Sequence, residues 1–279
     1  MYSICKKETL APNLYLFEVE AGRIAKKAEA GQFIIIRKDD YAERIPLTIA
    51  DFSREKGTIT IIFQVVGAAT RDLAECAAGD QILDVVGPLG VASEIENYGT
   101  VVCIGGGVGI APVYPIARAL KEAGNRVISI IGARSSDILF WKDKMAAVSD
   151  ELLIATDDGS EGRKGFVTDI LKDVLGREEV AHIWAIGPMI MMRAVSQVSK
   201  PSGVKTIVSL NPIMVDGTGM CGACRVGVGK ETKFACVDGP EFDAHEVDWD
   251  LAMKRSGLFR HEEKMGMEHK KGGGACKCH

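Results

Sequence analysis

The chain has 279 residues, 47% of them hydrophobic and 26% charged, which are ordinary values for a globular protein with room for two or three compact domains. Its 34 Lys and Arg against 38 Asp and Glu give a net charge of −4, which argues against a nucleic-acid surface and favours proteins or small molecules as partners. No stretch reaches about 18 uninterrupted apolar residues and the N-terminus lacks an apolar signal core, so we expect no membrane association and a cytoplasmic location.

Residues 1–97 are expected to form a small antiparallel β barrel. Their apolar runs are short, rich in β-branched residues and separated by Gly, Asp and Pro turns, a pattern typical of barrels. One short helical pattern, at 70–76, interrupts them. The expected strands are 13–20, 31–38, 46–53, 57–66 and 80–90.

Residues 98–204 follow a different pattern, in which continuous apolar runs alternate with helix-like stretches. Runs without polar alternation are typical of parallel strands that are buried on both faces. The β–α alternation therefore predicts a doubly wound nucleotide-binding domain. The expected strands are 100–106, 126–134, 151–159 and 182–188, and the expected helices are 111–124, 137–148, 164–176 and 189–200.

Glycine-rich loops follow three of these strands, at 105–112, 156–167 and 185–192. Glycines leave the backbone open to a pyrophosphate or a nicotinamide, and the helix that begins near Pro112 offers free amides and the positive end of its dipole. The first loop alone also suits a purely structural turn, but three loops at the carboxyl edge of one sheet favour a ligand site. The candidate NAD(P)-binding residues are Gly105, Gly106, Gly107, Gly109, Ala133, Arg134, Asp157, Asp158, Gly187, Pro188 and Met189.

The segment 205–262 contains a glycine-rich loop with four potential metal ligands. Their spacing, with four, two and eleven residues between them, matches the loop around a plant-type 2Fe–2S cluster, except that aspartate takes the first place. Glycines within the loop let the backbone fold closely around an inorganic core and direct its amides at the sulfurs. The candidate ligands are Asp216, Cys221, Cys224 and Cys236.

Two alternatives remain for this loop. Asp216 can be an Asp-Gly turn residue without a metal role. The Cys-x-x-Cys pair can bind zinc, although a zinc ribbon needs a second such pair and only the lone Cys236 follows within 205–262. A zinc-stabilised scaffold without redox activity is therefore the non-enzymatic alternative. Beyond the loop, residues 263–279 are rich in Gly and Lys and are expected to form a flexible tail.

The barrel segment carries two further motifs. In ERIPLTIAD, Arg44 precedes Pro46 and Thr48, and in VVGAATRDL, Gly67 precedes Thr70. An arginine can pair with a phosphate in bidentate fashion, although such a residue alone is more often a solvated charge. A threonine hydroxyl can donate to, or accept from, the edge of a flavin ring.

Together these motifs resemble the ferredoxin–NADP⁺ reductase superfamily, over nearly the whole chain to about residue 240. The resemblance implies that FAD binds between barrel and sheet and exchanges a hydride with a nicotinamide, without a general acid or base. It also implies that the loops at 105–112 and 187–189 surround the pyridine nucleotide. The FAD-binding residues that it implies are Arg44, Pro46, Leu47, Thr48, Gln64, Val66, Gly67 and Thr70.

The appended loop resembles, more narrowly, the electron-transfer subunits related to that of dihydroorotate dehydrogenase, which carry FAD and a 2Fe–2S cluster. Those subunits supply four cysteines, and aspartate in the first place instead resembles the small subunits of electron-bifurcating NADH-dependent reduced ferredoxin:NADP⁺ oxidoreductases. The resemblance implies electron transfer between NAD(H), FAD and the cluster, with a larger flavin and iron–sulfur subunit as partner and ferredoxin reached through that complex. A dihydroorotate dehydrogenase subunit and a hydrogenase-associated diaphorase subunit remain alternatives.

The sequence leaves the nicotinamide preference open. After the second expected strand of the α/β segment, Arg134, Ser135 and Ser136 can hold the 2′-phosphate of NADP(H), while Asp137 would oppose one. The resemblance implies NAD(H).

Overall fold

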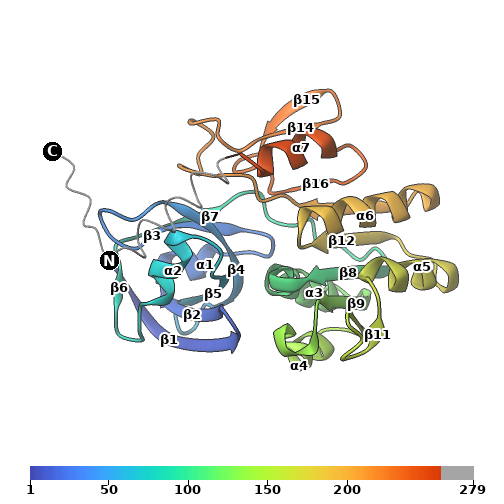
Figure 1. The fold of residues 1–279 in the computed structure, drawn as a ribbon, viewed down its shortest axis with the longest axis horizontal. Helices are drawn as coiled ribbons and strands as arrows, with labels where there is room; N and C mark the ends of the chain where they lie inside the picture. The colour runs from blue at the N-terminus through green and yellow to red at the C-terminus, as the bar shows by residue number, and fades with distance from the viewer. Residues whose placement is uncertain (259–279) are drawn as a thin grey trace.

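The computed structural model describes residues 1–258, so the predicted tail over 263–279 lies outside the described residues. A barrel and an α/β sheet domain lie side by side, and a smaller C-terminal part lies above their junction in the view of Figure 1. None of the helices within residues 1–258 is long and apolar enough to cross a membrane.

The N-terminal part is a nearly closed antiparallel barrel, which confirms the predicted fold class. Alternate side chains of each strand face its interior, where Phe17, Ile34, Ile36 and Ile61 form the core. The strands, in the order β6-β1-β2-β5-β4-β3-β7, are β1 (Tyr2–Ala11), β2 (Leu14–Glu20), β3 (Phe33–Arg37), β4 (Ile45–Ser53), β5 (Thr58–Gln64), β6 (Gln81–Ile82) and β7 (Asp84–Leu89). Two short helices, α1 (Gly22–Lys27) and α2 (Ala68–Ala74), complete this part.

The central part is a parallel sheet with one antiparallel edge strand, in the order β11-β10-β9-β8-β12-β13-β16. Its strands are β8 (Thr100–Gly106), β9 (Arg126–Ala133), β10 (Glu151–Thr156), β11 (Arg163–Lys164), β12 (His182–Ile186), β13 (Lys205–Ser209) and β16 (Glu241–Asp243). Its helices are α3 (Ile110–Glu122), α4 (Lys142–Ala147), α5 (Val167–Arg177) and α6 (Met189–Ser199).

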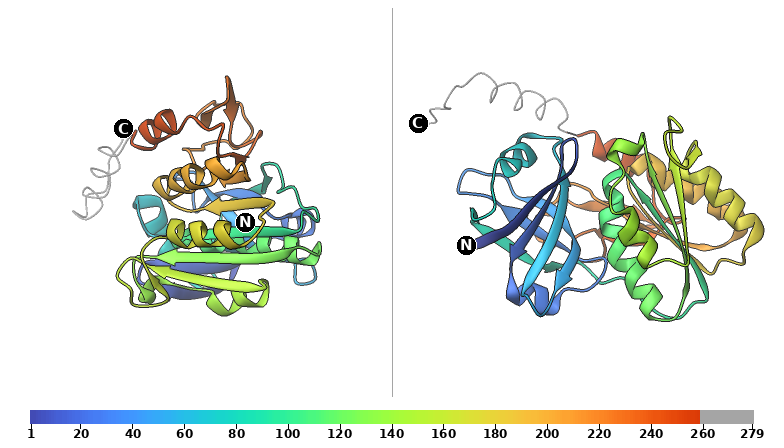
Figure 2. Two further views of the ribbon diagram at one scale, coloured as in Figure 1. Left: turned by 90° about the vertical axis from the view of Figure 1, so that its right-hand side faces the viewer. Right: turned by 90° about the horizontal axis from the view of Figure 1, so that it is seen from below.

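Helices cover both faces of this sheet, as a doubly wound fold requires. Val101 and Val127 pack with α3 and α4 in one apolar core, whereas Val102 and Ile128 pack with α5 and α6 in another. In the right-hand view of Figure 2, the green helix α3 lies between the sheet and the barrel and the yellow helices lie on the far side. This double burial explains the continuous apolar runs in the sequence.

The C-terminal part begins and ends on the same sheet. It leaves from β13 and returns through β16, which pairs antiparallel with β13 from Ser209↔Glu241 to Ile207↔Asp243. Between them lie the predicted cluster loop and a hairpin of β14 (Arg225–Val228) and β15 (Glu231–Phe234), and α7 (Trp249–Ser256) follows. Two strands of the segment 205–262 therefore extend the sheet of the segment 98–204, and the sheet does not end at the expected boundary.

Two ion pairs with one carboxylate join the barrel to the sheet domain. Asp51 on β4 accepts hydrogen bonds from Nη1 of Arg118 on α3 at 2.7 Å and from Nζ of Lys144 on α4 at 3.1 Å. Apolar side chains of the barrel, such as Leu16 and Ile62, pack in the same core as α3. Helix α3, which starts at the first glycine loop, is thereby held against the barrel.

Candidate functional site

The predicted nucleotide-binding loops meet at one edge of the sheet. Strands β8, β9, β10 and β12 are parallel, so the loops that follow them lie at their common carboxyl edge. The chain runs from β8 outward to β10 and then returns to the other side of β8 as β12. The strand order therefore reverses between β8 and β12, which is where ligands bind in such sheets.

The loops after β8 and β12 are in direct contact. A Cβ atom on Gly109 would lie 2.1 Å from the carbonyl oxygen of Ile186, and one on Gly187 would lie 3.0 Å from that of Gly106. Gly106 in turn faces the sulfur of Met191. Glycine is therefore required at 109 by close packing of two backbones, in addition to any ligand.

The loops after β9 and β10 also contact each other. The amides of Asp157 and Asp158 donate to the carbonyls of Ala133 and Arg134, at 3.1 and 3.2 Å. Hydrogen bonds from Ser160 hold the pKa of the Asp158 carboxyl below its ordinary value, so this carboxyl is anionic at neutral pH. All the predicted NAD(P)-binding residues thus lie in two pairs of touching loops at one edge.

The two flavin motifs lie at one end of adjacent antiparallel strands. Arg44 immediately precedes β4, Pro46 and Thr48 lie in its first half, and the stretch from Gln64 to Thr70 follows from the end of β5. Strands β4 and β5 pair antiparallel, with Ile49 opposite Ile61. Residues before Ile49 therefore lie beside residues after Ile61. The structure thereby brings together the motifs that the sequence separates by about twenty positions.

Two polar side chains of these motifs differ in their hydrogen bonding within the protein. Thr70 Oγ1 accepts from the amides of Val66 and Gly67, at 3.0 and 3.1 Å, and so closes the start of α2. The Arg44 guanidinium is exposed, and its nearest carboxylate partner is Asp84 at 3.9 Å. Arg44 therefore has donors available for a phosphate.

Exposed apolar side chains lie on these same loops, and of them the sequence pattern had singled out only Val66. Val108 follows the first glycines, Phe166 lies near the end of the 156–167 loop, and Ile190 follows the Gly-Pro-Met turn. They are 37%, 62% and 68% exposed, respectively. Val66, in the flavin motif, is 74% exposed. Exposed apolar side chains beside convergent polar groups are typical of a site that ring-shaped ligands cover.

In the cluster loop, two of the predicted ligands lie together in the interior. The sulfurs of Cys224 and Cys236 are 3.2 Å apart, and both residues are buried. Two thiolates on one tetrahedral iron or zinc, with bonds of about 2.3 Å, would stand about 3.8 Å apart. Burial raises the pKa of the Cys236 thiol, so binding of a metal centre here must release protons.

Asp216 and Cys221 form the other half of the loop. The Asp216 carboxylate accepts from the amide of Thr218 at 2.7 Å and from that of Cys221 at 2.8 Å. These backbone hydrogen bonds, that from Thr218 first, lower the pKa of the Asp216 carboxyl and keep it anionic. The turn role foreseen as an alternative is thus present, and an anionic oxygen stands beside Cys221.

The donors fit a two-iron cluster better than a single ion. A 2Fe–2S cluster divides its four donors between two irons, which agrees with one thiol pair and one aspartate–cysteine pair. The amide of Gly219 also points at the Cys236 sulfur, as amides do around such clusters. Asp216, Cys221, Cys224 and Cys236 would hold the cluster, which would supply one-electron chemistry.

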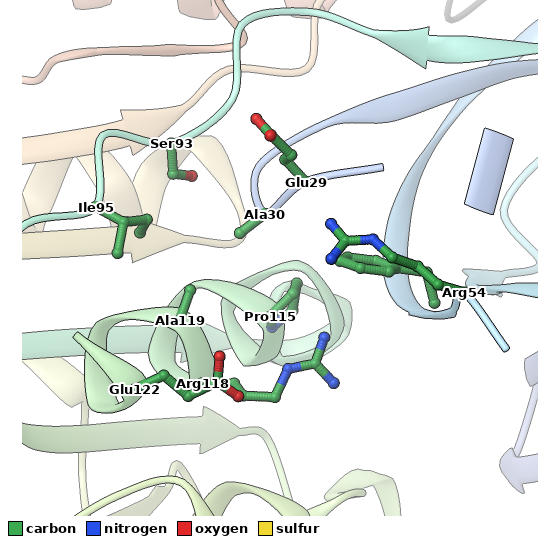
Figure 3. A pocket seen from close by; sticks show the side chains of 10 residues that line it. Glu29, Ala30, Arg54, Ser93, Ile95, Pro115, Arg118, Ala119 and Glu122 are labelled. Atoms are coloured by element: carbon green, nitrogen blue, oxygen red, sulfur yellow. The ribbon is translucent and has the colours of Figure 1, made fainter. Parts of the chain in front are cut away.

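A groove of about 680 Å³ lies away from all of these loops (Figure 3). It runs between the barrel and the outer side of α3, with Arg54 and Arg118 on its walls and Glu29 and Glu122 at its edges. Both guanidinium groups lie over the ring of Phe52, about 5.5 Å from its centre. The groove contains none of the predicted cofactor residues.

Two family models match the chain. Residues 211–248 match the iron–sulfur cluster binding domain of dihydroorotate dehydrogenase B, and residues 103–197 match an oxidoreductase NAD-binding domain. These matches fall on the cluster loop and on the glycine loops. Together with the reductase-like barrel, these matches show that the chain binds NAD(H), FAD and a 2Fe–2S cluster.

Similar proteins cover nearly the whole chain. A dihydroorotate dehydrogenase B (NAD⁺) electron transfer subunit homolog from Thermotoga maritima is 51% identical over 95% of this chain and 94% of its own length. The corresponding subunit from Desulforamulus reducens is 33% identical over 86% and 95%. A solved structure of an NADH-dependent reduced ferredoxin–NADP oxidoreductase, described for flavin-based electron bifurcation, is 49% identical over 96% and 97%, with a TM-score of 0.92.

More distant structures share the fold alone. Phthalate dioxygenase reductase is 18% identical, with a TM-score of 0.62 over 88% of this chain and 97% of its own. At 33% identity or more over at least 86% of the chain, the nearer relatives decide the family. The chain therefore belongs to the family of NAD(P)H-linked electron-transfer subunits that includes the one of dihydroorotate dehydrogenase B.

Proposed function

We propose that this chain is the small subunit of a flavin-based electron-bifurcating oxidoreductase acting between NAD(H), NADP(H) and ferredoxin. In this role it passes electrons between NAD(H), FAD and a 2Fe–2S cluster, and exchanges them with a larger flavin and iron–sulfur subunit. The similarity to the bifurcating enzyme, with a TM-score of 0.92, supports this assignment. Aspartate in the first ligand position separates the chain from subunits with four cysteines.

The observation that carries the proposal is a shared apolar core between barrel and cluster loop. Phe33 and Ile35, on the outer side of β3, pack in the same core as Cys224 and Cys236. Strand β3 pairs directly with β4, which carries the flavin motif. A cluster held by these cysteines would lie one strand away from the flavin, as an electron relay needs.

The residues of the chain provide binding and position. The backbone of 105–109 and the start of α3 favour a pyrophosphate through open amides and the helix dipole. Arg44 neutralises a phosphate of FAD. When bound, FAD supplies hydride exchange with the nicotinamide and single-electron exchange with the cluster.

The acidic character of the β9 and β10 loops supports NAD(H) as the nucleotide. Ser135 Oγ donates to the carboxylate of Asp137, and Asp158 stands on the neighbouring loop, which contacts the backbone of Arg134. Two carboxylates near a ribose would repel a 2′-phosphate and accept from a 2′-hydroxyl. NADH should therefore reduce the flavin faster than NADPH. Equal rates would count against this preference.

Purification of the native complex tests the whole assignment. The chain should co-purify with a larger flavin and iron–sulfur subunit, and the complex should reduce ferredoxin and NAD⁺ together at the expense of NADPH. We place the complex in the cytoplasm, where thiols such as the six cysteines of the described residues stay reduced. A complex without ferredoxin activity would defeat the bifurcating role.

Two related roles remain as second candidates. The Thermotoga maritima and Desulforamulus reducens relatives favour the electron-transfer subunit of a dihydroorotate dehydrogenase. Co-purification with a catalytic subunit that oxidises dihydroorotate would establish that role. A hydrogenase as partner would instead establish a diaphorase subunit.

A further inference from the structure

The cluster loop rests on the outer surface of the barrel at a point of very close contact. Gly217, which follows Asp216, is buried and has a left-handed backbone with φ of +77°. A Cβ atom there would lie 2.7 Å from Cδ1 of Leu89 on β7 and 3.0 Å from Cγ1 of Ile35 on β3. The loop backbone therefore lies directly on these two side chains, above β3 and β7 in Figure 1.

The same barrel surface also supports the other end of the cluster segment. A Cβ atom on Gly90 would lie 2.9 Å from both Phe33 and Pro240, and the amide of Val91 donates to the carbonyl of Gly239 at 2.7 Å. Gly239 and Pro240 follow closely after Cys236. We call Phe33, Ile35 and Leu89 the barrel platform. Ile35 and Leu89 lie against Gly217, before Cys221, and Phe33 lies against Gly90, which faces Pro240 after Cys236.

The barrel platform lies on the same side of the sheet as the flavin motif. Phe33 is opposite Thr48 and Ile35 is opposite Pro46 in the β3–β4 pairing, and directly opposed residues project to the same face. Ile34 and Ile36 project into the barrel core instead. Ile35 therefore lies beside the flavin motif on one face of the sheet and also against Gly217 of the cluster loop.

We propose that the barrel platform consists of positioning residues that set the distance between FAD and the 2Fe–2S cluster, and that Gly217 is the position that permits their closest approach. This inference rests on the proposed function, in which one electron leaves the reduced cluster and is accepted by the flavin, or the reverse. The platform takes no part in the chemistry. It fixes the separation because an apolar core close to crystal density resists compression.

Alanine at position 217 tests the inference, and a matched glycine in the same loop controls for backbone strain. Gly219 also has a left-handed backbone, with φ of +83°, but its nearest neighbour is Val237 at 3.1 Å, inside the cluster segment. Both Gly217→Ala and Gly219→Ala strain the loop, whereas only Gly217→Ala pushes it away from the barrel. Thermal stability should fall in both variants.

The deciding measurement is the rate at which an electron redistributes between cluster and flavin after rapid one-electron reduction of the full-length holoprotein. We expect a severalfold slower rate in Gly217→Ala, no comparable change in Gly219→Ala, and recovery in Gly217→Ala/Leu89→Ala, where the nearest clashing side chain is removed. FAD content, iron content and both midpoint potentials are measured in parallel. Equal slowing in the two glycine variants would overturn the inference.

A second variant covers the case in which Gly217→Ala does not retain its cluster. Leu89→Phe enlarges the platform from the barrel side, leaves the loop sequence untouched and should slow the same step. A wild-type rate in Leu89→Phe with both cofactors bound would refute the positioning role. A wild-type protein that contains no FAD or no cluster would instead refute the proposed function, so the two failures are distinguishable.

Discussion

Ser93 donates a 2.6 Å hydrogen bond to Oε1 of Glu241, across 148 positions of sequence. The other carboxylate oxygen faces Nε1 of the fully buried Trp184 at 3.4 Å. Ser93 belongs to the connection after the barrel, Trp184 to β12 and Glu241 to β16. This carboxyl group therefore ties the three parts of the molecule together at one point.

Glu241 should make the stability of the protein depend on pH. Burial raises the pKa of its carboxyl to about 7, with the hydrogen bonds from Ser93 and Trp184 opposing that shift. Between the unfolded pKa, about 4.3, and pH 7, the folded state holds a proton that the unfolded state has lost. The free energy of unfolding therefore contains a contribution that falls as pH rises through this window, by roughly 3–4 kcal/mol for a shift of this size.

Glu241→Gln should remove this contribution. The amide keeps one acceptor and the shape of the side chain but carries no charge, so the variant should gain stability relative to wild type above pH 7. Denaturant unfolding at pH 5.5 and at pH 8 checks this. An identical pH dependence in the two proteins would contradict it.

Cys224→Ala should lose iron and keep FAD. Cys224 is buried against Cys236 in the cluster segment, whereas the flavin motifs lie on β4, β5 and α2 of the barrel. Iron analysis and the flavin absorbance of the purified variant measure the two groups separately. Cys5→Ala, at an exposed thiol on β1, is the control and should keep both. Full iron content in Cys224→Ala would rule out the assigned ligand.

Variants of Asp216 should separate its turn role from its ligand role. Asp216→Asn keeps an acceptor for only one of the two amides of Thr218 and Cys221 and removes the anionic donor, so we expect a labile or absent cluster. Asp216→Cys should retain a cluster with a changed midpoint potential, because thiolate replaces a harder oxygen donor. Redox titration of wild type and Asp216→Cys measures this. The same potential in both, with full iron in Asp216→Asn, would leave Asp216 a turn residue only.

Alanine should affect flavin reduction by NADH differently at two glycines of the first nucleotide loop. Gly109→Ala places a methyl group 2.1 Å from the Ile186 carbonyl oxygen, so the β8 and β12 loops must separate and reduction of the flavin by NADH should be lost. Gly107 has a φ of +54° but no atom within 4 Å of the added methyl group. Gly107→Ala leaves the β8 and β12 loops in contact and should cost only about 1–2 kcal/mol of stability. Thermal unfolding and NADH stopped-flow distinguish them, and matching behaviour of the two variants would be the contrary result.

The parts of the fold with regular apolar periods could be predicted from the sequence. Continuous runs such as 126–133 predict parallel strands, and glycines after them predict where a nucleotide would bind. Strand β1 could not be predicted, because most of its residues are at least partly exposed and its apolar pattern is weak. Strand β16 has three residues, too few for any period to appear.

The site was predictable as a set of motifs but not as an arrangement. The spacing of the cysteines follows from the loop that must surround a cluster, so it is visible in the chain itself. The contact of Gly217 with Ile35 depends on how a loop packs on a distant barrel, which no local pattern encodes. One feature of the sequence does point to this contact, because residues 33–36 are four apolar residues in a row. In the structure all four are buried. A strand with both faces buried must be covered from outside, here by the cluster segment.

The return of the chain through β16 has a consequence for how the protein matures. The loop that receives iron is closed at its base by two neighbouring strands, Ser209 pairing with Glu241, and these pairings contain no cysteine. The pairing of β13 with β16 therefore needs no cluster ligand. The apoprotein would then present a tethered and partly shaped receptor to the machinery that inserts the cluster, instead of an unfolded end.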